Sequence, residues 1–298
     1  MAITGSPGRP SGSPADAIGR ALDDEVVALV AVHGGDVSES FRVDLASGRT
    51  VFAKTHRRPP PGFFVTEAVG LAWLREASAV AVPEVLAVVD EPPVLVLEWV
   101  EAGSPVRSTE ADLGRALAVL HRAGAPTFGR EDRRTTGSRG LPNEPYDTWA
   151  EAYAANRLRP IARLARDAGA LSARSIRALE QVAGRLPELG GPSEPPARLH
   201  GDLWAGNRLI GAGGVNWLID PAAHGGHREF DLAMMRLFGG FGPDCFAAYA
   251  EAAPLADGWE ARVPLHQLAP LAVHAIQFGG HYAGATERAL VAVLGAGA

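Results

Sequence analysis

The hydrophobic pattern of this chain changes once, near residue 100, and the change limits the folds that are open to it. Between residues 26 and 98, short apolar segments alternate with turns, as in VVALVAVH, SFRVDL, TVFAK, VPEVLAVV and PPVLVLEWV. From residue 109 onward, apolar residues recur three or four positions apart, as in ADLGRALAVLHR, YDTWAEAYAANRL and SARSIRALEQVAGRL. The first pattern is typical of β-strands and the second of amphipathic helices. We therefore expect an α+β fold, with a small N-terminal antiparallel sheet and a larger, mainly α-helical C-terminal part.

Two segments depart from this division. FFVTEAVGLAWLREA (63–77) has helical spacing inside the strand-rich part, which places Glu67 on a helix that follows the strand carrying Lys54. In the helical part, a loop rich in Gly and Pro (184–196) precedes three short β-like pieces, ARLH, NRLI and VNWLID. The N-terminal part is therefore expected to be strands plus one helix, and the C-terminal part helices plus a small β insert.

The length predicts two packed units, since domains average about 150 residues and the chain has 298. Residues 1–14, MAITGSPGRPSGSP, hold too few apolar residues to fold, so we interpret them as a disordered tail before a first helix at Asp16–Leu22. We expect an N-terminal lobe over residues 15–98 and a C-terminal lobe over residues 99–298.

Composition excludes several classes of protein. No apolar stretch reaches the roughly 18 to 20 residues of a membrane helix, and the N-terminus lacks the apolar centre of a signal peptide. The net charge of −6 offers no basic face for nucleic acid. Because Cys245 is the only cysteine, neither an internal disulfide nor a site of clustered thiolates can form. We expect a cytoplasmic protein without nucleic-acid or membrane partners, of unknown oligomeric state.

The basic residues contain one anomaly. Of the 28, 27 are arginine and one is a lysine, Lys54. A lysine ammonium is a compact point charge and an arginine guanidinium is a wide planar fork, so a site needing one ammonium among phosphates would resist replacement by arginine. The alternative is chance retention on a solvated strand.

The densest group of chemically active residues lies in LHGDLWAGNRLI (199–210) and WLIDPAAHGG (217–226). Asp202 follows one strand, Asn207 opens the next and Asp220 ends the third, so the three side chains should converge. Their spacing matches the catalytic loop and the metal-binding loop of protein kinases. The pattern is weak alone, but Lys54 and the helical Glu67 precede it in the order that phosphoryl transfer from ATP requires.

Phosphoryl transfer gives each of these residues a role. Asp202 would accept the proton of the substrate hydroxyl. Asn207 and Asp220 would bind Mg²⁺, which prefers oxygen ligands. Lys54 would pair with ATP phosphates and would be held in position by Glu67.

Two further segments would complete the ATP site. Gly34 and Gly35, between the first two expected strands, would let the backbone turn over the phosphates without a side-chain collision. Glu98, Trp99 and Val100 form the link between the two lobes, where backbone groups can hydrogen-bond the adenine. Trp99 is equally explained as a core residue.

Each candidate also has a structural explanation. Asp202 and Asn207 can simply cap a turn, and Lys54 with Glu67 can be an exposed ion pair. Asp220 can start a turn before a proline. The conjunction of all five in one order favours the catalytic interpretation.

Two neighbours of these residues are expected to support them. We expect His200 to brace the loop of Asp202 by bonding backbone groups, because a histidine beside such a loop is more often structural than catalytic. Asp231, in REFDLAMM, either opens a helix or bonds back to that loop.

The motifs resemble those of the fructosamine kinase family, also called ketosamine-3-kinases. The resemblance is carried by HGDLWAGN, IDPAAHGGHREFDLAMMRLFGGF, GGDVSESFRVDL, FFVTEAVGLAWL and PLAVHAIQFGGHYAGA, and covers about residues 15–294. It implies a two-lobed protein-kinase-like fold, shared with aminoglycoside and choline kinases, whose N-terminal lobe binds ATP and whose C-terminal lobe holds the catalytic and substrate-binding residues. It also implies ATP-dependent phosphorylation of the 3-hydroxyl of a ketosamine, free or on a protein lysine. The phosphorylated adduct decomposes and releases the amine, so the activity amounts to deglycation.

The acceptor site is the least readable part. A ketosamine carries a protonatable amine beside several hydroxyls, so its site near Asp202 should offer a carboxylate and an aromatic or imidazole wall. The candidates for substrate binding are Trp204, His224, His227 and Glu229, with His274 and Tyr282 from the C-terminal helices as secondary ones.

Two other functions fit parts of the pattern. The acceptor can be an aminoglycoside or a choline-like amine, with the same phosphoryl transfer. The chain can also be a nucleotide-binding pseudokinase that acts as an interaction module, although pseudokinases usually lack the base or a metal ligand and this sequence retains both.

Overall fold

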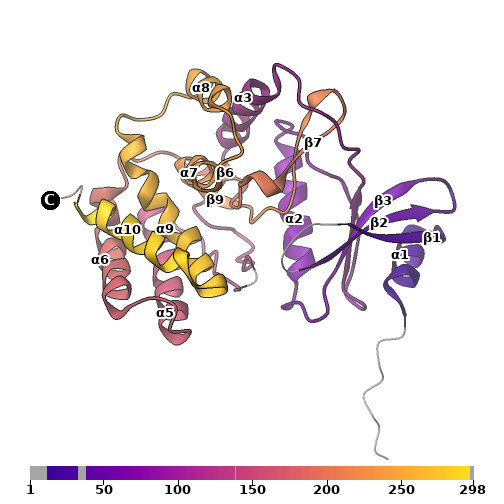
Figure 1. Ribbon diagram of the computed structural model, residues 1–298, viewed down its shortest axis with the longest axis horizontal. Coiled ribbons are helices and arrows are strands. Elements are labelled where there is room, and N and C mark those ends of the chain that lie inside the picture. Colours follow the sequence, from indigo (N-terminus) through magenta and orange to yellow (C-terminus); the bar gives the residue numbers. More distant parts are fainter. Residues whose placement is uncertain (1–11, 33–37, 138, 296–298) are drawn as a thin grey trace, which may run out of the picture. The chain divides into compact units, whose positions relative to one another are not determined.

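The computed structural model describes residues 12–32, 38–137 and 139–295. The chain divides into two compact units, one of Met1–Ala72 with Pro83–Glu101 and the other of Trp73–Val82 with Ala102–Ala298. The first unit contains α1 (Pro14–Leu22), β1 (Val26–Val32), β2 (Glu39–Leu45), β3 (Thr50–Thr55), most of α2 (Phe63–Glu76), β4 (Val85–Val89) and β5 (Val94–Glu98). Figure 1 shows both units, coloured along the sequence.

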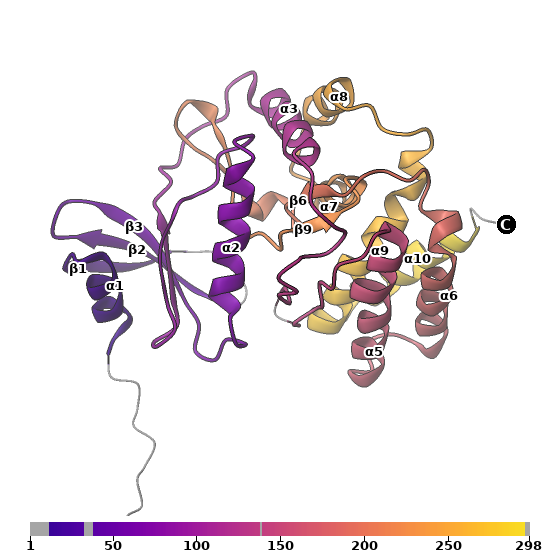
Figure 2. The ribbon, with the colours of Figure 1, turned by 180° about the vertical axis from the view of Figure 1, so that it is seen from behind.

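The first unit is an antiparallel sheet with the strand order β1-β2-β3-β5-β4. Helix α1 covers one face of it (Figures 1 and 2), and Ile18 of this helix shares a core with Val51, Ala53 and Val94. Because side chains alternate along a strand, Lys54 lies on the opposite face from Ala53. The alternation of β3 thus separates a core face from a face that carries the ammonium.

Helix α1 begins two residues earlier than expected. The Ser13 hydroxyl accepts a hydrogen bond from the Asp16 N–H, and the Asp16 carboxylate accepts one from the Ser13 N–H. This reciprocal cap satisfies N–H groups at the start of the helix, where Pro14 is the first residue. Residues 1–11 of the expected tail, 1–14, lie outside the described residues.

The second unit is mainly helical, as its periodicity predicts. Its helices are α3 (Thr109–Arg122), α4 (Trp149–Tyr153), a π-helical turn (Ala154–Leu158), α5 (Arg159–Asp167), α6 (Ala173–Leu189), α7 (Glu229–Phe238), α8 (Pro243–Ala252), α9 (Trp259–Phe278) and α10 (His281–Gly295). Helices α4 to α7, α9 and α10 enclose its main core, which contains Leu158, Ile161, Leu179, Leu268 and Leu290.

The loop expected at 184–196 starts later than its Gly and Pro residues predict. Helix α6 continues through Pro187 to Leu189. A proline inside a helix has no N–H to donate to the carbonyl four residues back, and α6 ends two residues after Pro187.

The β insert of the second unit forms two small antiparallel pairs. β6 (Ala197–Leu199) pairs with β9 (His224–Gly226), and β7 (Arg208–Ile210) pairs with β8 (Asn216–Leu218). Figure 1 shows β6 and β9 beside α7. The antiparallel N-terminal sheet and the mainly helical C-terminal unit confirm the expected α+β class. Among the described residues, no helix has both the length and the apolar character that crossing a membrane requires.

Candidate active site

Lys54 and Glu67 form a buried ion pair within the first unit. The Lys54 Nζ lies 2.8 Å from the Glu67 Oε1, and the two side chains are 7% and 12% exposed. An exposed ion pair was the alternative explanation, and this burial excludes it. Burying two charges carries a desolvation penalty that weakens the case for a purely stabilising role.

Asp202, Asn207 and Asp220 converge in the second unit, as their spacing predicts. The Asn207 Nδ2 donates to the Asp202 Oδ2 at 3.0 Å and to the Asp202 backbone carbonyl at 2.8 Å. It also lies 3.4 Å from the carbonyl oxygen of Asp220. The short hairpin of β7 and β8 brings the chain back to Asn207, whose carbonyl accepts from the Ile219 N–H at 3.0 Å.

The environment of Asp202 raises the pKa of its carboxyl above the value of an aspartate in water. Burial raises the pKa of this carboxyl to about 7, the hydrogen bond from Asn207 opposes the rise, and the nearby Asp220 and Asp231 add to it. A general base works best when its pKa lies near the pH of the reaction. The raised pKa of Asp202 is compatible with its expected role as a general base.

His200 braces the loop from inside, as expected. Its Nε2 donates to the Ile219 carbonyl at 2.9 Å and its Nδ1 accepts from the Asp202 N–H at 3.3 Å, so both ring nitrogens are bonded to backbone. Burial lowers the pKa of His200, which keeps the ring neutral and compatible with one donating and one accepting nitrogen.

Asp231 lies in the first turn of α7 and also bonds back to the same loop, so it combines both of its expected positions. Its carboxylate accepts from the N–H of His200 at 2.8 Å and from the N–H of Gly201 at 2.9 Å. The backbone of Gly201 has φ +81°, and a Cβ there would lie 2.2 Å from the Ala222 carbonyl oxygen, so only glycine fits.

The sequence analysis did not predict that Asp231 also contacts His121, which in turn contacts Tyr249. The His121 Nε2 lies 3.2 Å from the Asp231 Oδ2, and the His121 Nδ1 lies 2.8 Å from the Tyr249 hydroxyl. All three side chains are buried. Burial raises the pKa of Asp231, but bonds and charges from His121, His200 and Gly201 outweigh this and lower it. The apolar periodicity of α3 and α8 gave no signal for this chain of bonds.

The group of oxygens around Asn207 suits a divalent cation. With its Nδ2 bound to Asp202 and directed toward the Asp220 carbonyl, the Asn207 side chain keeps Oδ1 as the atom able to coordinate. The carboxylates of Asp202 and Asp220 lie close enough that Asp220 raises the pKa of Asp202. Hard oxygen donors beside concentrated negative charge are the ligands that Mg²⁺ prefers.

Trp204 lies on the surface of the same loop. It is 40% exposed, its ring covers Gly206, and it contacts Phe238 edge to face with ring centroids 6.0 Å apart. The exposure of this ring leaves it free to contact a bound molecule, and its expected role in the acceptor site stays a prediction.

The other three candidates for substrate binding, His224, His227 and Glu229, are buried. His224 is buried, its Nδ1 bonds the Ala222 carbonyl, and burial lowers its pKa to about 3. Glu229 is 1% exposed and both of its oxygens accept from Arg262, at 2.5 and 2.9 Å. His227 is also buried, and burial lowers its pKa to about 4. Their expected role in substrate binding stays a prediction, and His224 and His227 line a small hollow together with Trp149 and Arg157.

His227, Glu229 and His266 resemble a metal site in donor type and spacing. However, the guanidinium of Arg262 already binds the carboxylate of Glu229, and a second cation would be repelled there. We interpret this cluster as an internal ion-pair network rather than a metal centre.

The structure describes only some of the residues that are expected to contact the nucleotide. Gly34 and Gly35 lie outside the described residues. Glu98 ends β5, and Trp99 and Val100 follow it at the end of the first unit, all three partly buried. The Trp99 Nε1 donates to Glu101 at 2.9 Å, which fixes the ring beside the link.

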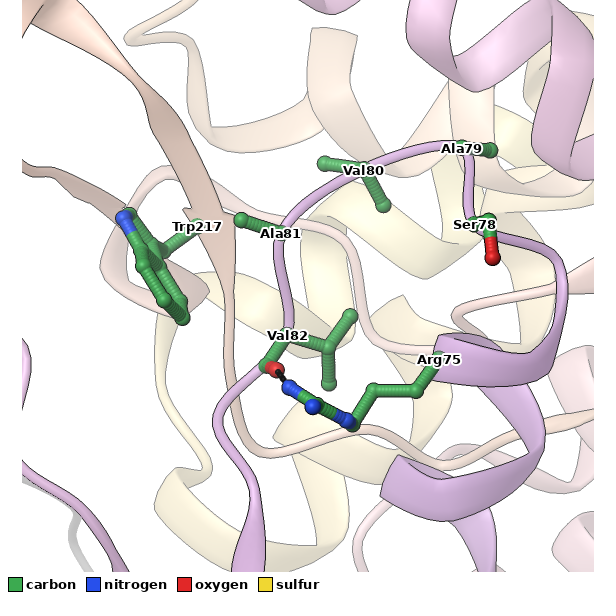
Figure 3. A pocket seen from close by; sticks show the side chains of 7 residues that line it. All are labelled: Arg75, Ser78, Ala79, Val80, Ala81, Val82 and Trp217. Atoms are coloured by element: carbon green, nitrogen blue, oxygen red, sulfur yellow. Dashed lines mark hydrogen bonds between the residues drawn. The ribbon is translucent and has the colours of Figure 1, made fainter.

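A separate hollow of about 380 Å³ lies beside β8, in the second unit. Figure 3 shows Trp217 on one side of it and Arg75, which donates to the Val82 carbonyl, on the other. The remaining lining residues are Ser78, Ala79, Val80, Ala81 and Val82. The lining has no carboxylate and no histidine, so we assign this hollow no part in the chemistry.

Comparisons with known proteins find relatives over most of the chain. A family model described as fructosamine kinase matches residues 15–296. A probable ketoamine kinase of Enterococcus faecium is 34% identical over 266 residues, covering 88% of this chain and 94% of the relative. One of Thermus thermophilus is 36% identical over 261 residues, covering 88% and 92%.

Solved structures are similar over nearly the whole length. A candidate fructosamine-3-kinase of Thermobifida fusca is 40% identical, with a TM-score of 0.88, over 96% of this chain and 99% of the other. A choline kinase of Streptococcus pneumoniae is 15% identical, with a TM-score of 0.64, over 94% and 97%. At that identity the likeness shows the fold alone, and it confirms the protein-kinase-like fold.

Proposed function

The chain belongs to the fructosamine kinase family, and on that premise we propose that it transfers the γ-phosphoryl group of ATP to the 3-hydroxyl of a ketosamine. The family membership makes it a ketosamine kinase, and the ketosamine is a small-molecule substrate. The proposal adds the hydroxyl, the residues and the fate of the product. The phosphorylated adduct would release its amine, so the reaction would reverse glycation of free amines or protein lysines.

The observation that carries the proposal is the setting of Asp202. Its loop is fixed from below by Asp231, its carboxylate is held by Asn207, and its pKa is raised to about 7. A carboxylate so fixed can orient the acceptor hydroxyl and take its proton while the oxygen attacks phosphorus. The new O–P bond forms as the bond to the ADP leaving group breaks.

Lys54 is our candidate for the phosphate contact. Glu67 holds its ammonium at 2.8 Å, which restricts a flexible side chain to one position. A fixed point charge can neutralise phosphate oxygens, and the rarity of lysine in this chain is explained if arginine cannot take its place. Gly34, Gly35, Glu98, Trp99 and Val100 remain the proposed backbone contacts to the nucleotide.

ATP and Mg²⁺ are the proposed cofactors. Solved structures of the same fold contain AMP in the choline kinase and ADP in an aminoglycoside phosphotransferase. Asn207 and Asp220 would hold the Mg²⁺, which would supply positive charge to the phosphate oxygens. The single cysteine of the sequence favours the reducing cytoplasm as the compartment.

Among the candidates for substrate binding, we propose that Trp204 contacts the acceptor. A ketosamine amine is cationic at neutral pH, and an exposed indole binds such a cation through its ring face. His274 and Tyr282 lie near the same surface through Phe238, which contacts both Trp204 and His274.

A panel of acceptors tests the proposal. ADP release should be measured with Mg²⁺ and ATP against fructosamines, ribulosamines, an aminoglycoside and choline. We expect turnover with at least one ketosamine and none with choline or the aminoglycoside. Turnover confined to the aminoglycoside or choline would replace the acceptor class, and binding of ATP without turnover on any acceptor would favour a pseudokinase.

A further inference from the structure

Arg208 lies directly after Asn207 in the second unit, and the sequence analysis did not single it out. Its side chain is only 5% exposed. The Arg208 Nη1 lies 2.6 Å from the Glu110 Oε1, and its Nε donates to the Asn216 Oδ1 at 2.8 Å. One guanidinium thus joins β7 to its partner strand β8 and to the first turn of α3.

The strand β8 is held by the same turn of α3. Asn216 is buried, and its Nδ2 donates to the Thr109 carbonyl at 2.8 Å. The Thr109 hydroxyl donates to the Gly214 carbonyl, in the turn of the hairpin, at 3.0 Å. Both strands of the hairpin are therefore fixed to the first two residues of α3, Thr109 and Glu110.

Glu110 also connects the hairpin to the segment before α8. Its Oε2 accepts from the Gly242 N–H at 2.7 Å, and Gly242 is the N-cap of α8. In the same segment, a Cβ on Gly240 would lie 2.4 Å from the Cβ of Ala205, which belongs to the loop between the proposed base and the proposed metal ligand. The carboxylate of Glu110 therefore ties together three segments that surround this loop.

The contacts of Arg208 do not favour a purely stabilising role. A buried ion pair often stabilises a fold less than apolar side chains of similar volume would. Within the described part of the chain, the Arg208 Nη2 is buried without a hydrogen-bond partner, which adds a further cost. The guanidinium is planar, so its bonds to Glu110 and Asn216 fix the direction in which β7 begins.

Both proposed metal ligands are attached to the hairpin that this pair fixes. Asn207 precedes Arg208, Asp220 lies two residues after β8, and the Asn207 carbonyl accepts from the Ile219 N–H at 3.0 Å. We propose that Arg208 and Glu110 are positioning residues that hold the two metal ligands in the geometry of one Mg²⁺ site. The inference rests on the proposed function, in which Asn207 and Asp220 hold the Mg²⁺.

The test measures the affinity of the protein for Mn²⁺ in the presence of ADP, by electron paramagnetic resonance, which requires neither an acceptor nor turnover. Arg208→Met removes both polar contacts and keeps an unbranched side chain, and we expect the dissociation constant for Mn²⁺ to rise about ten- to a hundred-fold. Arg208→Lys can keep the ion pair with Glu110 but not also the bond to Asn216, so the rise should be smaller. Arg115→Met is the matched control and should keep the native constant, because Arg115 forms an exposed ion pair with Asp112 on α3.

A comparison of kinetic constants separates positioning from general support of the fold. Arg208→Met should raise the Mg²⁺ concentration at half-maximal turnover by a similar factor and should leave KM for the ketosamine unchanged. The midpoint of thermal unfolding without metal should also stay near that of the native chain. An equal rise in both kinetic constants, together with a lower midpoint, would show that Arg208 only supports the fold and would overturn the inference.

The remaining results separate the inference from the proposed function. Native affinity for Mn²⁺ in Arg208→Met would overturn the inference and leave the proposed function standing. Native affinity in Asp220→Asn would reject the proposed metal ligands, and the inference with them. The expected changes in Mn²⁺ affinity without phosphorylation of any ketosamine would reject the proposed acceptor and support the positioning role. Should Arg208→Met unfold, Arg208→Lys and Glu110→Gln decide the question, since a raised dissociation constant in both supports the inference and a native one overturns it.

Discussion

The side-chain amide of Asn207 donates to the carboxylate of Asp202 at 3.0 Å, which joins the proposed metal ligand to the proposed base. The same amide donates to the backbone carbonyl of Asp202 at 2.8 Å. One side chain thus fixes both the position of the base and the loop that carries it, and leaves its own oxygen for a cation. The proposed chemistry depends on this arrangement more than on any other contact.

Asp202→Asn should reduce kcat by about 10²- to 10⁴-fold, because an amide cannot accept the hydroxyl proton. The shape and the neighbours of the side chain change little, so the midpoint of thermal unfolding should stay close to that of the native chain. Coupled-assay kinetics and calorimetry check the two parts. Asp244→Asn, at an exposed position of α8, is the matched control and should keep native kcat. A variant at position 202 with more than a tenth of native kcat would contradict the assigned role.

Glu67→Gln should lower the free energy of unfolding by about 3 kcal/mol, since it leaves the buried ammonium of Lys54 without its carboxylate. It should also raise KM for ATP, because Lys54 is no longer held in place. Urea unfolding measures the first effect and steady-state kinetics the second.

The control for this prediction is the exposed ion pair between Arg57 and Glu39, whose atoms are 3.2 Å apart and whose side chains are 89% and 56% exposed. Glu39→Gln should cost at most about 1 kcal/mol. Equal losses of unfolding free energy in Glu67→Gln and Glu39→Gln would show that burial does not make the pair of Lys54 and Glu67 more important for stability.

Tyr249→Phe tests the chain of bonds behind the catalytic loop. The substitution leaves the buried Nδ1 of His121 without its partner, which should cost about 1 to 3 kcal/mol of unfolding free energy. Because His121 supports Asp231, hydrogen exchange at the His200 and Gly201 amides should become faster. Tyr146→Phe, at a partly exposed tyrosine, should leave both quantities unchanged. Native exchange rates in Tyr249→Phe would mean that the loop does not depend on this support.

The stability of the second unit should depend on the ionisation of Glu229. Burial raises the pKa of this carboxyl, but hydrogen bonds and charges from His266 and Arg262 outweigh burial and lower the pKa to about 2, from about 4.5 for a glutamate in water. A lowered pKa adds stability that is complete above pH 4.5 and is lost as the pH falls toward 2. The native chain should therefore lose roughly 2 to 3 kcal/mol in this interval beyond the loss in Glu229→Gln.

Urea unfolding at pH 7, 4.5 and 3 measures that difference. The gap in unfolding free energy between the native chain and Glu229→Gln should be widest at pH 7 and should narrow by pH 3. A gap that is the same at every pH would show that Glu229 does not titrate in this interval.

Local patterns predicted most of the fold and part of the site. The strands, the helices and the convergence of Asp202, Asn207 and Asp220 follow from periodicity and from spacing within about 20 residues, where the chain itself limits the geometry. His121 and Tyr249 were not predicted, because they are 128 residues apart in sequence and meet only through the packing of α3 and α8. The ion pair of Glu229 was not predicted for the same reason, since its partner Arg262 lies 33 residues away on α9.

The most direct test of the central claim identifies the product of the reaction. The native chain should be incubated with Mg²⁺, ATP and a fructosamine, and the products should be followed by ³¹P nuclear magnetic resonance and mass spectrometry. We predict a phosphate ester on the 3-hydroxyl that appears with ADP and then decays with release of the free amine, and no ester with Asp202→Asn. Formation of ADP with inorganic phosphate alone, or of an ester on a different hydroxyl, would contradict the account.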